Sequence, residues 1–95
     1  MLTESEKQII IELAEKYNVS RLLLFGSNTN PEHDANDIDL GVDGLANELF
    51  FKFYSELIFK LPKPVDLIDL SRPSHFTKAI SEDSINLYDR TEKEN

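Results

Sequence analysis

Two aspartates, Asp37 and Asp39, are separated by a single residue in the segment Asp37-Ile38-Asp39-Leu40. If this segment is a strand, both carboxylates lie on one face, with backbone positions about 6.6–6.8 Å apart. Two ionised carboxylates at this spacing repel each other unless a cation lies between them. Because the chain has no cysteine, oxygen ligands favour Mg²⁺ or Mn²⁺ over zinc. On its own, however, the motif is also typical of an exposed strand face.

Gly26 and Ser27 follow the apolar segment 19–25 directly. A glycine after a buried strand lets the backbone turn tightly and approach a ligand, and the following amides and hydroxyl can hold phosphate oxygens. The segment is not a Walker loop, because it lacks the Gly-Lys-Ser/Thr sequence. Gly26 and Ser27 are therefore candidate phosphate-binding residues, although an ordinary turn would have the same pattern.

A third acidic group lies in the otherwise apolar segment Val65-Asp66-Leu67-Ile68-Asp69-Leu70. A carboxylate buried in such a strand without a partner is costly. Asp66 and Asp69 are three residues apart, so in a strand they face opposite sides and only one of them can meet Asp37 and Asp39.

The composition limits the class of protein. A chain of 95 residues buries roughly 60–65% of its unfolded surface around one core, so we expect a single domain over residues 1–95. Eighteen acidic against ten basic residues give a net charge of −8, which repels nucleic acid. No apolar run approaches the roughly 18 residues of a membrane span. The acidic start of the sequence is unlike a signal peptide, so we expect a cytoplasmic protein.

The pattern of apolar residues predicts alternating helices and strands. A capping box at Thr3 and Glu6 precedes a first helix that Asn18 ends. The further predicted elements are a central strand at 19–25, a strand at 37–42, a helix at 45–61, a strand at 65–70, a helix at 74–82 and a short strand at 85–88. The last five residues are polar, and we expect them to fray.

Taken together, Leu24-Phe25-Gly26-Ser27, nine further residues, Asp37-Ile38-Asp39-Leu40 and Val65-Asp66-Leu67 resemble the signature of the minimal nucleotidyltransferases. These proteins belong to the DNA polymerase β superfamily, and the resemblance covers nearly the whole chain. It implies an α/β (α+β) fold in which helices flank a small mixed sheet. The implied activity is the transfer of a nucleoside monophosphate from a nucleoside triphosphate onto a hydroxyl.

The resemblance also implies a role for each motif residue. Gly26 and Ser27 would hold the β- and γ-phosphates, and Asp37 and Asp39 would bind Mg²⁺. Asp66, rather than Asp69, would complete the site as general base or second metal ligand. Three converging carboxylates suit two metal ions about 3.5–4 Å apart, which clamp the attacking and leaving oxygens.

The sequence departs from the family pattern at two places. Many members have a basic residue soon after Gly-Ser and a serine before the first aspartate, where this chain has Asn28-Thr29-Asn30 and Asn36. Arg72 or Lys78 could supply the missing positive charge, but each is also typical of a solvated surface. Efficient catalysis therefore depends on a cation that the motif does not provide.

The predicted helix at 45–61 is apolar over more than half of its circumference. One arc holds Leu45, Leu49, Phe50, Phe53 and Leu57, and the side chains of Phe51, Tyr54 and Ile58 widen it. One small core cannot easily cover such a surface, so we expect an interface there. The minimal nucleotidyltransferases that this chain resembles are similar to antitoxin subunits that pair with an all-helical partner, often a HEPN-domain toxin. The resemblance therefore implies such a partner at this surface; a homo-oligomer is the other expectation.

The resulting functional hypothesis is a Mg²⁺-dependent nucleotidyltransferase that moves AMP from ATP onto a hydroxyl, such as that of a tyrosine of a HEPN toxin. The alternative is a non-catalytic nucleotide- or partner-binding subunit of a toxin–antitoxin complex. The three acids favour the enzyme, whereas the missing basic residue favours the binding subunit.

Overall fold

A computed structural model describes residues 2–25, 37–71 and 84–93. Its helices are α1 (Glu4–Lys16), the 3-10 turn η2 (Asn47–Leu49), α2 (Phe50–Lys60) and α4 (Arg90–Lys93). Its strands are β1 (Arg21–Phe25), β2 (Ile38–Asp43), β3 (Val65–Asp69) and β4 (Ile85–Asp89). Within these ranges no helix combines the length and the apolar character that crossing a bilayer requires.

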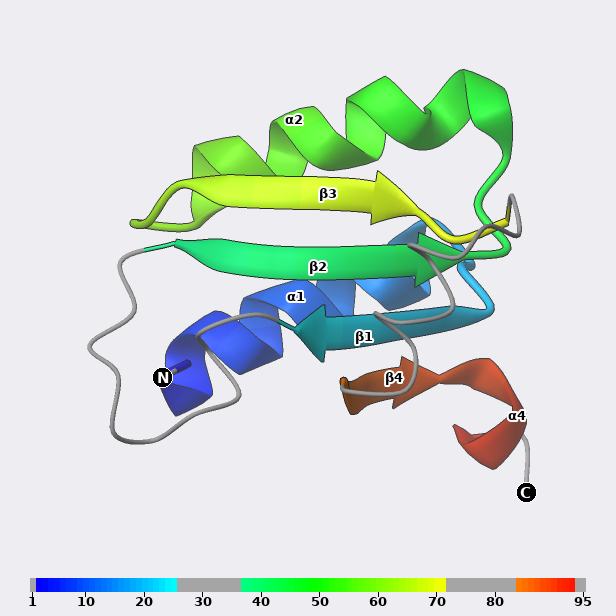
Figure 1. Cartoon of the computed structure of the whole chain (residues 1–95), viewed down its shortest axis with the longest axis horizontal. Coiled ribbons are helices and arrows are strands. Elements are labelled where there is room, and N and C mark those ends of the chain that lie inside the picture. Colours follow the sequence, from blue (N-terminus) through cyan, green and yellow to red (C-terminus); the bar gives the residue numbers. More distant parts are fainter. Residues whose placement is uncertain (1, 26–36, 72–83, 94–95) are drawn as a thin grey trace.

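The four strands form one mixed sheet in the order β3-β2-β1-β4. β1 lies in the middle of the sheet and runs antiparallel to both β2 and β4, whereas β2 and β3 are parallel. Figure 1 shows this order, with β3 and β4 at the two edges. The expected small mixed sheet flanked by helices is thereby confirmed.

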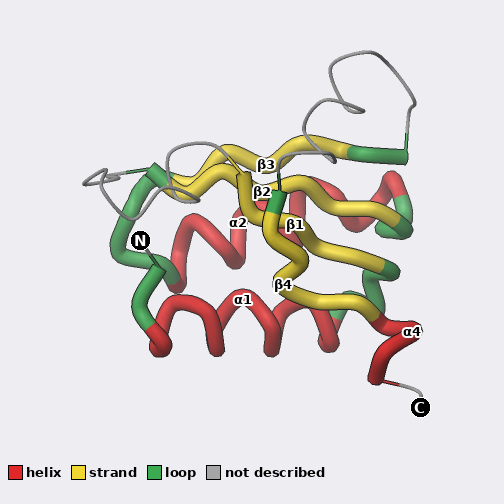
Figure 2. The backbone as a smooth tube through the Cα atoms, turned by 60° about the horizontal axis from the view of Figure 1, so that its bottom comes forward, coloured by secondary structure: helices red, strands yellow, loops and turns green. Residues whose placement is uncertain are grey.

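Helices α1 and α2 lie together on one face of the sheet (Figure 2). Strand β2 presents Ile38, Leu40 and Val42 to this face, and all three side chains are fully buried. They pack in a single core with residues from α1, α2 and the other strands, among them Ile10, Leu13, Leu22, Leu24, Phe53, Leu57, Val65 and Leu67. The period-two pattern of β2 therefore supplies the core from one side of the strand only.

The first helix begins as its sequence predicts. The Thr3 hydroxyl accepts a hydrogen bond from the Glu6 amide at 3.1 Å, and the Glu6 carboxylate accepts one from the Thr3 amide at 2.8 Å. This capping box satisfies two backbone amides that the first helical turn leaves without partners. Lys63, which precedes β3, lies 3.5 Å from the same carboxylate. The start of α1 is thus tied to the loop between α2 and β3.

The two helices are joined by an aromatic contact and a polar cluster. The rings of Tyr17 and Phe53 pack edge to face with centroids 5.3 Å apart. The Tyr17 hydroxyl donates to the Glu56 carboxylate, and this hydrogen bond raises the pKa of Tyr17 to about 12. Lys16 also binds Glu56, at 2.9 Å. These contacts fix α2 against the end of α1.

The predicted start of the second helix at Leu45 is wrong. Gly44 has a positive φ of 78°, and a Cβ there would lie 2.0 Å from the Ser20 hydroxyl oxygen, so the chain turns sharply after β2. Leu45 is then buried in the core, and Ala46 is still extended. Only after η2 does α2 begin, at Phe50. The helix therefore begins five residues later than predicted, after the extended segment that buries Leu45.

The C-terminal segment is more regular than expected up to residue 93. The short strand predicted at 85–88 is present as β4 and extends to Asp89. Of the last five residues, which were expected to fray, 91–93 belong to the helical turn Arg90–Lys93, whereas 94 and 95 lie outside the described residues. The Arg90 amide donates to the Ser20 carbonyl at 2.9 Å, and its guanidinium reaches the Asn18 carbonyl at 3.3 Å. These bonds hold the turn against the loop before β1. The helix predicted at 74–82 lies outside the described residues.

Candidate active site

Strand β2 directs Asp39 to the face of the sheet that α1 and α2 do not cover. Its neighbours Ile38 and Leu40 are fully buried on the helix side, so alternation places the half-buried Asp39 on the opposite, open face. Asp37 directly precedes the strand and is exposed. The sequence Asp-Ile-Asp-Leu therefore gives the core its apolar side chains and gives the open face its acids.

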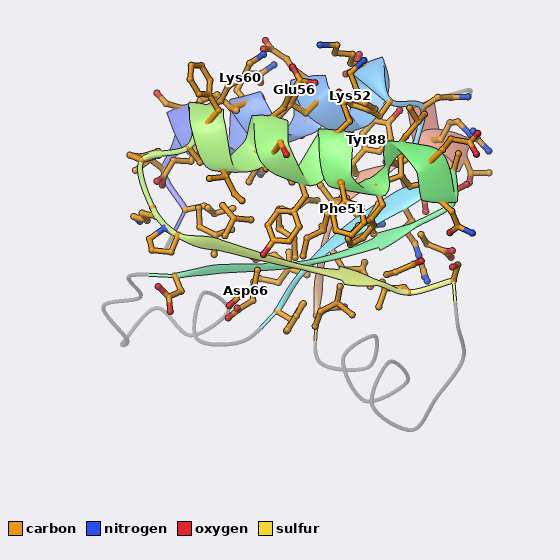
Figure 3. The ribbon with its side chains drawn as sticks, turned by 90° about the horizontal axis from the view of Figure 1, so that it is seen from above. Phe51, Lys52, Glu56, Lys60, Asp66 and Tyr88 are labelled. Carbon is orange, nitrogen blue, oxygen red and sulfur yellow. The ribbon has the colours of Figure 1, made fainter. Side chains whose placement is uncertain are left out.

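Strand β3 brings the third acid beside this pair. Val65 and Leu67 are buried, while Asp66 between them is exposed. The parallel register pairs Asp39 with Asp66, and neighbouring strands lie about 4.7–4.9 Å apart. Figure 3 shows the Asp66 side chain on the side of the sheet opposite α2. Asp39 and Asp66 are thus adjacent on the open face.

The pKa of Asp39 is affected by the two neighbouring acids. Partial burial raises the pKa of the Asp39 carboxyl, and the charges of Asp66 and then Asp37 raise it further. A hydrogen bond between the Asp39 and Asp66 carboxyl groups acts in the same direction. A bound cation would remove the repulsion between these carboxylates.

Asp69, the other candidate for the third carboxylate, has a different environment. It is the last residue of β3 and pairs with Val42, at the far end of the register from Ile38. Its carboxylate accepts a hydrogen bond from the Ser71 amide at 2.9 Å, an arrangement in which an aspartate stabilises its own turn. Asp69 is also absent from the charges that shift the pKa of Asp39. The geometry favours Asp66.

The predicted phosphate-binding residues, Gly26 and Ser27, lie outside the described residues, as do Arg72 and Lys78. Strand β1 ends at Phe25, whose register partner on β2 is Asp39. The residue that precedes Gly26 in the sequence is therefore a direct neighbour of the acid site.

The donor chemistry of the three acids fits a hard divalent cation. Carboxylate oxygens are the ligands that Mg²⁺ and Mn²⁺ prefer, so Asp37, Asp39 and Asp66 could hold such an ion. Within residues 2–25, 37–71 and 84–93, however, no group of three or more acidic, histidine or cysteine side chains is arranged to hold a metal. The charges of Asp37 and Asp66 can shift the pKa of Asp39 over distances longer than a metal–oxygen bond of about 2.0–2.1 Å, so this shift does not require the three carboxylates to converge on one point. The three acids are thus neighbours rather than an assembled ligand set.

Gly41 is a further residue of the site that the motif did not single out. It follows Asp39 by two residues on the same face of β2, and a Cβ on Gly41 would lie 2.8 Å from a methyl carbon of Leu70. Leu70 therefore packs directly over Gly41, and its amide bonds the Val42 carbonyl at 2.8 Å. These contacts anchor the end of β3 on β2, and thereby the register that pairs Asp66 with Asp39. A lone glycine inside a strand is the sequence signal for such a close approach.

Comparison with known proteins agrees with this geometry. The family model described as "Polymerase beta, Nucleotidyltransferase" matches residues 7–93. The chain belongs to this family. The match begins within α1, extends across the whole sheet and α2, and includes all three acids of the candidate site. The chain is therefore a nucleotidyltransferase domain, as its motifs predicted. No curated protein matches the sequence at a significant level.

Several solved toxin–antitoxin complexes contain a chain with the same fold. A toxin–antitoxin complex with AMP-PNP aligns with a TM-score of 0.72 and 26% identity, over 92% of this chain and 76% of that chain. The MntA–HepT complex aligns with a TM-score of 0.69 and 23% identity, over 96% and 76%. A Shewanella oneidensis complex of a tri-AMPylated HEPN toxin with an MNT antitoxin gives 0.71 and 23%, over 98% and 77%. At 23% identity, the last two show the shared fold.

Proposed function

We propose that this nucleotidyltransferase domain is an MNT-type antitoxin that transfers AMP from ATP onto a hydroxyl, such as a tyrosine hydroxyl, of a HEPN-type toxin in the cytoplasm. The observation that carries the proposal is the register pair Asp39 and Asp66 beside Asp37 on the open face of the sheet. The AMP-PNP in a similar toxin–antitoxin complex supports an adenine nucleotide as the substrate. The tri-AMPylated toxin of another complex with this fold suggests the modification to test.

Asp37 and Asp39 are the residues that would hold Mg²⁺, with Asp66 as a further ligand or as the base. Such an ion, when bound, would neutralise the charge that develops on the phosphates during nucleotidyl transfer. Asp66 is exposed beside Asp39, so it can accept the proton that the attacking hydroxyl loses. The new bond joins that oxygen to the α-phosphorus, and pyrophosphate leaves. Burial and the charges of Asp66 and Asp37 raise the pKa of Asp39, and a bound cation would oppose that shift because it stabilises the ionised carboxylate.

A second candidate is the non-catalytic subunit, in which the same fold binds the toxin without modifying it. It is favoured by Asn28-Thr29-Asn30, which stands where many family members have a basic residue. In that case the acids would contribute to nucleotide or metal binding alone, and no covalent label would reach the partner.

The deciding experiment uses ATP labelled at the α- or the γ-phosphate. The proposal expects a HEPN-domain protein to be encoded next to this chain, and that protein is the acceptor in the assay. Wild type should transfer the α-label and not the γ-label. Asp39→Asn and Asp66→Asn should lower the rate at least about 100-fold, equivalent to about 2.7 kcal/mol of transition-state stabilisation.

Asp69→Asn is the matched control, because the asparagine oxygen can still accept from the Ser71 amide. It should leave the transfer rate near that of wild type. Transfer of the γ-label would instead indicate a phosphotransferase. Absence of any label above the Asp39→Asn background would favour the non-catalytic subunit.

A further inference from the structure

The outer side of α2 carries a stripe of apolar side chains that the fold leaves in water. Phe51 is 78% exposed, Ile58 56% and Phe59 88%. At about 100° per residue, they lie with Ser55 on one side of the helix, opposite the buried Phe53 and Leu57. We call Phe51, Ser55, Ile58 and Phe59 the α2 stripe. An apolar side chain exposed alone is ordinary, but three on one helical stripe are typical of an interface.

The exposed apolar surface of α2 differs in two residues from the interface that the sequence predicted. Tyr54 was expected to belong to it, but this side chain is half-buried and its hydroxyl donates to the Val65 carbonyl of β3 at 2.8 Å. Tyr54 therefore serves the chain's own fold by binding the edge strand. Phe59 takes its place, with the largest exposed fraction among the large apolar side chains that the structure describes.

The shape and chemistry of the stripe suit a helix. Its residues follow the i, i+4, i+7, i+8 spacing of a ridge that packs into the groove of another helix. Ser55, the small residue between the large ones, donates its hydroxyl to the Phe51 carbonyl at 2.7 Å, so burial would not leave it without a hydrogen bond. An extended peptide would instead need free backbone groups, which the interior of a helix does not offer.

The stripe and the acid site lie at the same edge of the sheet. Strand β3 is an edge strand; Tyr54 of α2 bonds it on one side, and Asp66 projects from it on the other. In Figure 3, Phe51 and Asp66 lie above and below β3, whereas Lys52, Glu56 and Lys60 follow a different edge of α2. A protein that covers the stripe and reaches around β3 would therefore come close to the acids.

Charge and area argue against a second copy of the chain as the occupant. Two copies would bring two net charges of −8 together, which opposes association. The three apolar side chains expose roughly 400 Å² in total, if each offers about 150–250 Å² when fully exposed. A stable dimer buries about 800 Å² per partner, so the stripe is too small by itself. It suits the centre of a larger interface with a basic partner.

We infer that the α2 stripe docks a helix of a basic, helical partner, and that this partner is the molecule whose hydroxyl reaches Asp66 around the β3 edge. The inference rests on the proposed function, in which the partner is a HEPN-type protein. Docking at the stripe would hold the acceptor beside the acids, so the stripe contributes to partner affinity and not to the chemical step.

The test replaces the stripe without touching the acids. Phe51→Lys combined with Phe59→Lys should weaken binding of the neighbouring gene's HEPN-domain product at least about tenfold and raise its KM, while kcat at saturation stays near wild type. Ile85→Lys on β4 is the matched control, because Ile85 is also exposed, at 44%, but lies at the opposite sheet edge. Binding is measured by titration calorimetry, and assembly by light scattering.

Each result has a distinct meaning. Unchanged binding by the double variant, with AMP transfer intact, would overturn the docking inference and leave the proposed function standing. Wild type that dimerises alone, and returns to a monomer in the double variant, would show a second copy as the occupant and also overturn it. A partner that binds through the stripe without receiving AMP would support docking and contradict the proposed chemistry. Failure of wild type to bind the partner would overturn both.

Discussion

The two faces of the sheet differ in what their side chains contribute, although they come from the same strands. On the helix side, Ile38 and Leu40 are buried in the core. On the open side, Asp39 lies beside Asp66, with an unfavourable charge interaction between them. One face therefore stabilises the fold, and the other carries like charges that lower its stability until a cation arrives.

The largest change in unfolding free energy should come from a substitution on the face of the sheet that α1 and α2 cover. Phe53 on α2 is fully buried and packs on Tyr17, so Phe53→Ala should cost about 3–5 kcal/mol of unfolding free energy. Domains of this size have about 5–15 kcal/mol in total. Urea denaturation followed by circular dichroism would measure the loss.

Phe51→Ala is the matched control, with the same substitution on the same helix at a side chain that is 78% exposed. It should change the unfolding free energy by about 0.5 kcal/mol or less. If both variants lost equal stability, α2 would not be buried on the side that the structure assigns to the core.

Features that depend on one segment of chain could be predicted from the sequence. The capping box at Thr3 and Glu6 uses groups three residues apart, and the alternation of β2 places Asp39 opposite the core. The same parity separates Asp66 from Asp69 in β3. These predictions succeeded geometrically because periods of 2 and 3.6 residues fix which way side chains point.

Features that depend on contacts between distant segments could not be read in this way. The helix at 45–61 looked continuous, but its start is displaced by Gly44 packing on Ser20. Tyr54 looked like part of an exposed surface, but it bonds the β3 backbone. In each case the deciding partner lies elsewhere in the sequence, and periodicity holds no information about it.

The next largest effect should come from metal binding on the open face. Mn²⁺ at about 100 times its dissociation constant would add about 2.7 kcal/mol to the unfolding free energy, seen as a rise in melting temperature. Asp37→Asn should reduce this response, because it removes one charged ligand. Phe51→Ala should keep the full response, since it lies on the other side of the sheet. An equal response in wild type and Asp37→Asn would place the metal elsewhere.

The smallest expected effect is a gain in stability on replacing Asp39 in the absence of metal. It tests most directly whether the acids of the open face destabilise the fold. Burial and the charges of Asp66 and Asp37 raise the pKa of Asp39 in the folded state. A raised carboxyl pKa means that the folded state binds the proton more tightly than the unfolded state, so Asp39 lowers stability progressively as the pH rises from the unfolded pKa to the folded pKa, and its penalty is complete above the folded pKa. Without metal, Asp39→Asn should therefore melt a few degrees higher than wild type at pH 7.

The pH dependence of that gain is the decisive measurement. Below the unfolded aspartate pKa of about 3.9, Asp39 is protonated in both states, and its penalty is absent from wild type as well. The difference in melting temperature between Asp39→Asn and wild type should accordingly shrink towards zero as the pH falls. Mn²⁺ should reverse its sign at pH 7, because only wild type keeps the full set of charged ligands. A variant less stable than metal-free wild type at pH 7 would mean that Asp39 supports the fold, contrary to the division between the two faces.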